Sequence, residues 1–326
     1  MDQPKRDRAQ RLGEFELIAR YFRPLASGRE GALGLTDDAA LIDIPAGRRL
    51  VVTADALVAG IHFLPEDPPD LVARKMLREN LSDLAAMGAA PLAYLMTCCF
   101  PATIDEAWLA GFAAGLAQDQ QEFAIALIGG DTTATPGPLT LSVTAFGTVA
   151  TGQELRRSTA RAGDLVAVSG TIGDAALGLA VIRGRLPSDE GTDALVDRQH
   201  LPQPRIALGQ RLVGLATACM DVSDGLAGDL GHICEASGLG AVVDAARVPL
   251  SPPARAILAR DPQWMTTVLT GGEDFELLFT LPPERESELA DLPVAVIGRM
   301  EVGSGVRVLD SAGHPLALGA GGYRHF

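Results

Sequence analysis

One stretch near residue 80 constrains the fold more than any other part of the chain: Met76-Leu77-Arg78-Glu79-Asn80-Leu81-Ser82-Asp83-Leu84-Ala85-Ala86-Met87-Gly88. Its leucines recur at helical spacing, so they share the buried face of a helix expected over residues 69–87. Asn80 and Asp83 are three residues apart, which stacks an amide and a carboxylate on that helix. Gly88 is the expected C-cap, and Pro91 prevents continuation. The sequence therefore predicts a packed helix that carries a carboxylate near its end.

Length and composition indicate a globular protein of two domains. The chain has 326 residues, of which 47% are hydrophobic and 21% charged. Because the composition changes at residues 151–153, we expect one domain at 1–150 and a second at 151–326. The polar N-terminus leads into no apolar segment and no apolar run could cross a bilayer, so we expect a cytoplasmic protein without a membrane partner.

Charge and residue usage exclude several classes of function. The net charge of −14 argues against a nucleic-acid partner. The four cysteines form no CxxC pair, which makes a structural zinc site improbable and favours buried, reduced thiols. Lys5 and Lys75 are the only lysines, and neither follows a GxxxxG run or lies in the strand motif of protein kinases. If the protein handles ATP, it uses neither of these phosphate-binding designs.

The pattern of expected elements favours an α+β fold, with a C-terminal domain of the α/β sandwich type. In the first half, helices are expected at 13–22, 69–87 and 105–118, and strands at 39–44, 49–58, 92–100, 123–128 and 139–149. Neighbouring strands there are expected to pair antiparallel, the last as a hairpin. In the second half, helices are expected at 174–182, 206–216 and 223–236, and strands at 164–169, 218–222, 276–281, 294–297 and 305–309. Residues 184–202 are expected to form a polar link.

Aspartates at turns and element ends form the main chemical signal. They are Asp38, Asp55, Asp83 and Asp131. Mg²⁺ takes hard oxygen ligands, and phosphoryl transfer often uses more than one such ion. A single turn aspartate is commonplace, so only the whole set carries the prediction.

Two glycine-containing motifs add phosphate-binding geometry. Gly129-Gly130-Asp131-Thr132 after an expected strand lets a phosphate approach the backbone, although a GGD alone is most often a turn. Asp221-Val222-Ser223-Asp224-Gly225-Leu226 is stronger, because its carboxylates flank a hydroxyl expected to cap a helix. No local spacing indicates a Ser/His/Asp or Cys/His dyad, so no covalent enzyme intermediate is expected.

Three further residues have equally good structural explanations. Arg157, beside Arg156, could clamp a phosphate or lie on the surface. His62 between apolar residues is, by itself, more often structural than ligand-binding. Tyr323 could stack on a flat ring or pack the C-terminal segment.

In order along the chain, these motifs resemble those of the thiamine-monophosphate kinase family, within the superfamily that includes aminoimidazole ribonucleotide synthetase. The series is Thr36-Asp37-Asp38, Thr53-Ala54-Asp55 with Gly60-Ile61-His62-Phe63, Asn80 to Gly88, Gly129 to Thr133, Asp221 to Leu226, and Gly271-Gly272-Glu273-Asp274-Phe275-Glu276. The resemblance runs from Phe15 to Phe326. It implies ATP-dependent phosphorylation of thiamine phosphate to thiamine diphosphate, with several Mg²⁺ ions and K⁺ as cofactors. It also implies a homodimer whose N-terminal mixed or antiparallel sheets join in a barrel.

The resemblance also implies residue roles. Metal ligands would be Asp38, Thr53, the main-chain carbonyl of Ala54, Asp55, Asp83, Asp131, Asp221 and Asp224. The nucleotide would be held by Gly130, Asp131, Arg157 and Ser223, and thiamine phosphate by His62, Glu273 and Tyr323. Of these, Asp83, Asp131 and Asp224 would stabilise the transferring phosphoryl group through their metals. Two departures concern Thr36, where the family often has glycine, and Ala54, where it has a hydroxyl residue.

Other activities stay open. Within the superfamily, aminoimidazole ribonucleotide synthetase is the second candidate. A two-metal phosphatase could use the same acids and would release inorganic phosphate without ATP. A catalytically silent protein would bind Mg-ATP without turning it over.

Overall fold

The structure is a computed structural model, and it describes residues 12–318. Its α-helices are α1 Glu14–Leu17, α2 Pro69–Ala86, α3 Glu106–Phe123, α4 Asp174–Ile182, α5 Asp193–His200, α6 Ile206–Leu212, α7 Leu226–Ser237, α8 Pro252–Arg260 and α9 Trp264–Thr270. Its strands are β1 Arg48–Val58, β2 Ala90–Phe100, β3 Leu127–Ala134, β4 Thr140–Ala150, β5 Leu165–Ser169, β6 Ala218–Asp221, β7 Gly240–Asp244, β8 Leu277–Leu281, β9 Val294–Glu301 and β10 Gly305–Leu309. Within the described range, none of the helices has the length and apolarity needed to cross a membrane.

The chain forms two compact units. The first is built mainly from residues before 147 and the second mainly from residues after it. Residues 45–53 and 78–90 belong with the second unit, so the start of β1 and the end of α2 are part of it.

The first sheet has four strands in the order β1-β4-β2-β3. Strands β2 and β3 are parallel, so the expectation that neighbouring pairs are antiparallel is wrong here. The physical reason is α3, which connects them and returns the chain to the starting edge, as a crossover between parallel strands requires. The expected hairpin ending in β4 is also wrong, because β4 lies between β1 and β2.

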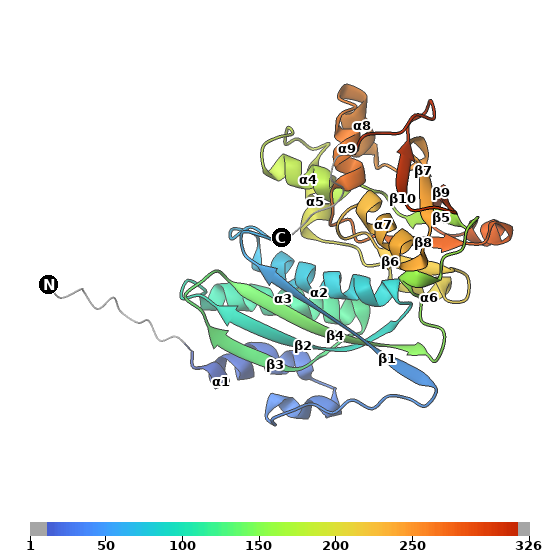
Figure 1. Cartoon of the computed structure of the whole chain (residues 1–326). Helices are drawn as coiled ribbons and strands as arrows, with labels where there is room; N and C mark the ends of the chain where they lie inside the picture. Colours follow the sequence, from blue (N-terminus) through green and yellow to red (C-terminus); the bar gives the residue numbers. More distant parts are fainter. Residues whose placement is uncertain (1–11, 319–326) are drawn as a thin grey trace. The chain divides into compact units, whose positions relative to one another are not determined.

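One face of the first sheet is covered by α2 and α3 (Figure 1). Burial alternates along β4, as expected for a strand with one face in a core. On β1 the alternate residues Leu50 and Val52 are 39% and 53% exposed. The mixed sheet, with helices on one side, agrees with the predicted α+β class.

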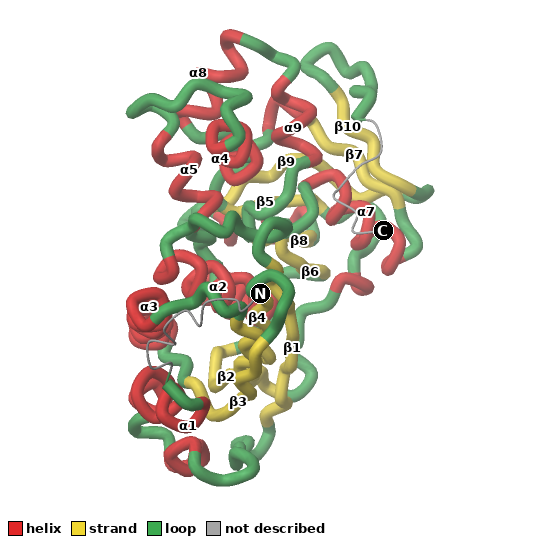
Figure 2. The backbone as a smooth tube through the Cα atoms, turned by 90° about the vertical axis from the view of Figure 1, so that its left-hand side faces the viewer, coloured by secondary structure: helices red, strands yellow, loops and turns green. Residues whose placement is uncertain are grey.

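The second sheet has six strands in the order β10-β7-β9-β5-β8-β6. Only β10 and β7 are parallel; the other pairs are antiparallel. Successive residues of β5 pack in two different hydrophobic cores, one on each face of the sheet. Val166 and Val168 pack in the first core, and Ala167 packs in the second. Residues of α4, α7 and α9 fill the first core, and α6 contributes to the second. Figure 2 shows α4, α7 and α9 in red beside the yellow strands of this sheet.

Several expected elements differ from the structure. Residues 39–44 form no strand, and the expected link 184–202 contains α5. Strand β7 and helices α8 and α9 were not expected, and α6 ends at Leu212. Ser223 does not cap α7: the N-cap is Gly225, which has no side chain that could accept a hydrogen bond.

Candidate functional site

Asp83, near the end of α2, belongs to a cluster of polar side chains in the second unit that contains two carboxylates. Its Oδ2 accepts a hydrogen bond from Thr53 Oγ1 on β1. The adjacent Ser82 donates through Oγ to Asp221 Oδ2 over 2.7 Å. Asp221 ends β6 and is buried. Two consecutive residues of one helix therefore form hydrogen bonds, one with the hydroxyl of Thr53 and one with the carboxylate of Asp221. Three predicted metal ligands, Thr53, Asp83 and Asp221, thus come together.

The electrostatics of this group favour a cation. Burial raises the pKa of Asp83 above its usual value, and the Thr53 hydrogen bond and the charge of Arg157 oppose that rise. Burial, followed by the charge of Asp83, raises the pKa of Asp221 to about 7. Two partly or fully buried carboxylates thus repel each other, and a divalent ion with a preference for hard oxygen would relieve the repulsion. The donor set fits Mg²⁺.

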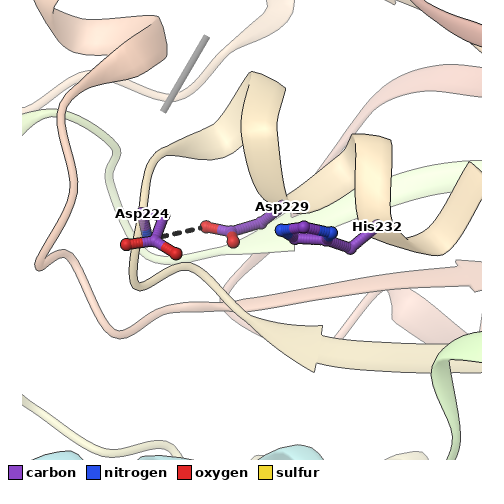
Figure 3. Close-up of side chains that lie close together, drawn as sticks. All are labelled: Asp224, Asp229 and His232. Atoms are coloured by element: carbon purple, nitrogen blue, oxygen red, sulfur yellow. Dashed lines mark hydrogen bonds between the residues drawn. The ribbon is translucent and has the colours of Figure 1, made fainter. Parts of the chain in front are cut away.

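Asp224, Asp229 and His232 form a second group, at the start of α7 (Figure 3). One ligand atom from each lies within 4.8 Å of the others, and no further group of three or more His, Cys, Asp or Glu residues meets that condition within residues 12–318. Asp229 Oδ2 accepts from the main-chain N–H of Asp224 and of Gly225, each over 3.0 Å. Burial raises the pKa of Asp229 to about 7, and the charge of Asp224 adds to the rise.

Asp229 therefore satisfies the helix-start donors that Ser223 was expected to satisfy. Asp229 was not among the predicted site residues, although an aspartate in the first turn of a helix is a recognisable signal. Ser223 is half-buried, and its carbonyl accepts from the main-chain N–H of Glu273 over 2.8 Å.

Glu273 is half-buried in the second unit. Its Oε2 accepts from Gln199 Nε2 on α5. The sequence analysis missed Gln199 because it assigned residues 184–202 to a polar link. Tyr323, the third residue predicted to hold thiamine phosphate, lies outside the described residues.

The remaining predicted residues lie in the first unit. Asp38 is exposed, and Asp55 on β1 is half-buried, its carbonyl accepting from Ser142 Oγ over 2.9 Å. Asp131 is exposed, and its Oδ1 accepts from the N–H of Thr132 over 2.9 Å. His62 Nδ1 accepts from the N–H of Val58 over 3.0 Å. In the described chain, the three aspartates are not brought into a group like that of Figure 3.

Gly130 and Ala54 have structural settings that the motif reading did not give. Gly130 lies inside β3, not in a loop after a strand. A Cβ there would stand 1.8 Å from Met96 O on β2, and its φ is 149°, so the close approach of two strands requires glycine. Ala54 is exposed and alternates along β1 with Thr53 and Asp55, so only its main chain could serve a metal.

Comparisons with known proteins identify the family of this chain. Residues 36–149 match the family model "AIR synthase related protein, N-terminal domain", and residues 161–311 match its C-terminal counterpart. The thiamine-monophosphate kinase of Salmonella typhimurium is 44% identical over 324 residues, which cover 96% of this chain and 98% of that protein. The chain belongs to the thiamine-monophosphate kinase family.

Solved structures of this family have the same fold. The crystal structure of thiamine-monophosphate kinase from Stenotrophomonas maltophilia K279a superimposes with a TM-score of 0.82 at 43% identity, covering 91% of this chain and 96% of that one. The structure described as AaThiL complexed with AMPPCP and TMP gives a TM-score of 0.79 at 31% identity, covering 97% and 99%. The resemblance drawn from the sequence motifs is confirmed.

Proposed function

We propose that this protein uses ATP to phosphorylate thiamine phosphate, forming thiamine diphosphate in the last step of that cofactor's synthesis. The observation that carries the proposal is the Thr53–Asp83–Asp221 group, in which two mutually repelling carboxylates are held by rigid elements near Arg157. Support also comes from the names of the relatives and from the related protein complexed with AMPPCP and TMP.

The transfer is direct and in-line. The attacking oxygen belongs to the substrate phosphate, which is already anionic near neutral pH, so no general base is needed. The barrier is repulsion between two anions, and bound Mg²⁺ would supply the positive charge that neutralises it. Asp83 and Asp221 hold that charge in place, since Thr53 and Ser82 fix their carboxylates.

The individual residue roles are part of the proposal. Asp38, Thr53, the carbonyl of Ala54, Asp55, Asp83, Asp131, Asp221 and Asp224 serve as metal ligands. Gly130, Asp131, Arg157 and Ser223 hold the nucleotide, and His62, Glu273 and Tyr323 hold thiamine phosphate. For Arg157, the support is its electrostatic effect on Asp83, Asp221 and Asp229.

The protein's wider setting is also proposed. It acts in the cytoplasm as a homodimer, with K⁺ as a cofactor besides Mg²⁺. The exposed apolar side chains Leu50 and Val52 on β1 support a dimer, because a sheet face of this kind gains stability when a second copy covers it. The domain boundary near residue 150 is supported by family models that end at 149 and begin at 161.

Incubation of the purified protein with Mg-ATP and thiamine phosphate tests the function. Thiamine diphosphate and ADP should appear in equal amounts, and both should require Mg²⁺. Inorganic phosphate without ATP consumption would instead indicate a phosphatase. Bound Mg-ATP that is never consumed would indicate a silent nucleotide-binding protein.

A further inference from the structure

Two of the residues 273–276, a segment that follows two glycines, adopt a backbone that is unfavourable for their side chains. Glu273 has φ 70° and Phe275 has φ 49°, and both lie in the left-handed region. Residues other than glycine stay in that region only where their surroundings determine the conformation, and such positions gather at binding sites. The conformation of residues 273–276 is therefore imposed by contacts with the surrounding structure.

Main-chain hydrogen bonds join this segment to residues 222 and 223. The N–H of Glu273 donates to Ser223 O and the N–H of Phe275 donates to Val222 O, each over 2.8 Å. The N–H of Val222 donates in turn to Glu276 O over 2.8 Å. The backbone that carries Glu273 is therefore fixed from one side.

Asp274 fixes the segment from a second side. It is buried, and its Oδ2 accepts from the N–H of Gly173 over 2.6 Å. Its Oδ1 accepts from the N–H of Ala175 over 3.3 Å. Asp274 thus closes the start of α4, where unpaired N–H groups favour a carboxylate.

Glu276 provides the third attachment. Its side chain is fully buried (0% exposed). Arg205 donates from Nε to Oε2 over 2.6 Å, Arg198 donates from Nη2 to Oε1 over 2.9 Å, and Ser169 Oγ donates to Oε2 over 2.5 Å. A buried carboxylate with this many charge-assisted partners is a rigid anchor.

Helix α5 contacts both the backbone and the side chain at this point. Arg198 Nη2 donates to the carbonyl of Asp274 over 3.0 Å, which adds to its contact with Glu276. The next residue, Gln199, is buried and donates through Nε2 to Glu273 Oε2. Asp274 and Glu276 are buried, whereas Glu273 is half-buried, so of these three side chains Glu273 is the one that solvent reaches.

We propose that Gln199 is a positioning residue for thiamine phosphate, acting through the carboxylate of Glu273. The amide fixes the rotamer of a side chain whose backbone is already held by hydrogen bonds, so the negative charge meets the thiamine moiety, whose thiazolium ring is cationic, without reorganising. This inference rests on the proposed function. It adds the residue that makes Glu273 a defined contact for the thiamine moiety, and it concerns binding of thiamine phosphate rather than of ATP.

The test is a double-mutant cycle of Gln199→Met, which keeps the volume and removes the amide, with Glu273→Ala. Gln199→Met should raise KM for thiamine phosphate about tenfold, the usual effect of losing one hydrogen bond to a charged group. Both kcat and KM for ATP should stay within about twofold. In the Glu273→Ala background, Gln199→Met should cause no further rise, because residues that act through one another are not additive.

Gln203→Met is the matched control. The Gln203 amide donates to Leu201 O over 3.2 Å, a main-chain acceptor away from Glu273, and its loss should leave every kinetic constant unchanged. If Gln199→Met does not fold, Gln199→Glu keeps the shape and polarity and should raise the same KM further. Additive effects in the cycle, or an equal rise in KM for ATP, would overturn the role proposed for Gln199 and leave the proposed function standing. A wild-type protein that forms no thiamine diphosphate would overturn the proposed function and this inference with it.

Discussion

Replacing Asp83 by asparagine separates stability from catalysis. The substitution keeps an oxygen that can accept from Thr53 Oγ1 and removes one negative charge beside Asp221. We expect turnover to fall by at least about a hundredfold, because the lost carboxylate is proposed to hold Mg²⁺, whose positive charge stabilises the transition state. We also expect the metal-free protein to become more stable.

The structure gives the size of that stabilisation. Burial is the largest cause of the raised pKa of Asp221 and the charge of Asp83 is the next, so removing Asp83 relieves part of the shift from 3.8 to about 7. One pKa unit corresponds to ~1.4 kcal/mol. A gain of about 1 kcal/mol raises Tm by roughly 2 °C in a chain of this size. The Asp221 carboxylate is increasingly charged above pH 7 in the native protein, so the gain grows with pH in that range.

Thermal unfolding at pH 8, in EDTA and in Mg²⁺, measures the stability of the metal-free protein and the stabilisation that Mg²⁺ adds. A ligand at about a hundred times its Kd stabilises by ~2.7 kcal/mol, so Mg²⁺ should raise the Tm of the wild type by roughly 5 °C and that of Asp83→Asn by much less. The control is Asp291→Asn, which removes an exposed carboxylate and should change neither Tm nor turnover. The reasoning is refuted if Asp83→Asn lowers Tm in EDTA, or if it keeps the wild-type response to Mg²⁺.

Three further predictions follow from other parts of the chain. Gly130→Ala should lower the free energy of unfolding by about 3 kcal/mol or more, since its Cβ would stand 1.8 Å from a β2 carbonyl; Gly137→Ala, whose nearest neighbour is 3.4 Å away, should have little effect in the same denaturant titration. Burial raises the pKa of Asp274 to about 8, so the native protein retains a proton that the unfolded chain releases, and stability should fall between about pH 4 and pH 8; Asp274→Asn should flatten that slope in Tm measurements. Val52→Asp should convert a dimer to monomers in sedimentation velocity, whereas Val302→Asp, at a site 85% exposed, should not; unchanged sedimentation of both would contradict the proposed dimer face.

The helix around Asp83 was predictable because its pattern is local. Periodic leucines and a glycine stop gave its expected range of 69–87, and α2 runs over Pro69–Ala86. Gly88 has the positive φ of 69° that a C-cap needs, and the N–H of Ala89 donates to Leu84 O over 2.8 Å. Similarly, α4 was expected at 174–182 and lies at Asp174–Ile182.

Elements that depend on partners were not predictable in this way. Helix α5 is short and mixed in polarity, and Gln199 is buried against a segment more than seventy residues away in sequence. Strand β3 extends through a glycine pair because β2 lies beside it, and its parallel direction depends on the crossover by α3. Local propensity penalises glycines inside a strand, so tertiary contact decides the outcome.

The two motifs on either side of α8 and α9 show why spacing alone cannot describe the site. Residues 221–226 and 271–276 were read as separate signals, one for metal and one for substrate, because fifty residues separate them. In the structure, main-chain hydrogen bonds of 2.8 Å join them, and a Cβ on Gly272 would stand 2.1 Å from Ser223 O. A shift of either segment must therefore move the other. Because Ser223 lies between Asp221 and Asp224, the position proposed for thiamine phosphate at Glu273 is mechanically tied to the position proposed for metal and nucleotide, and the accuracy of that tie depends on glycine at 272.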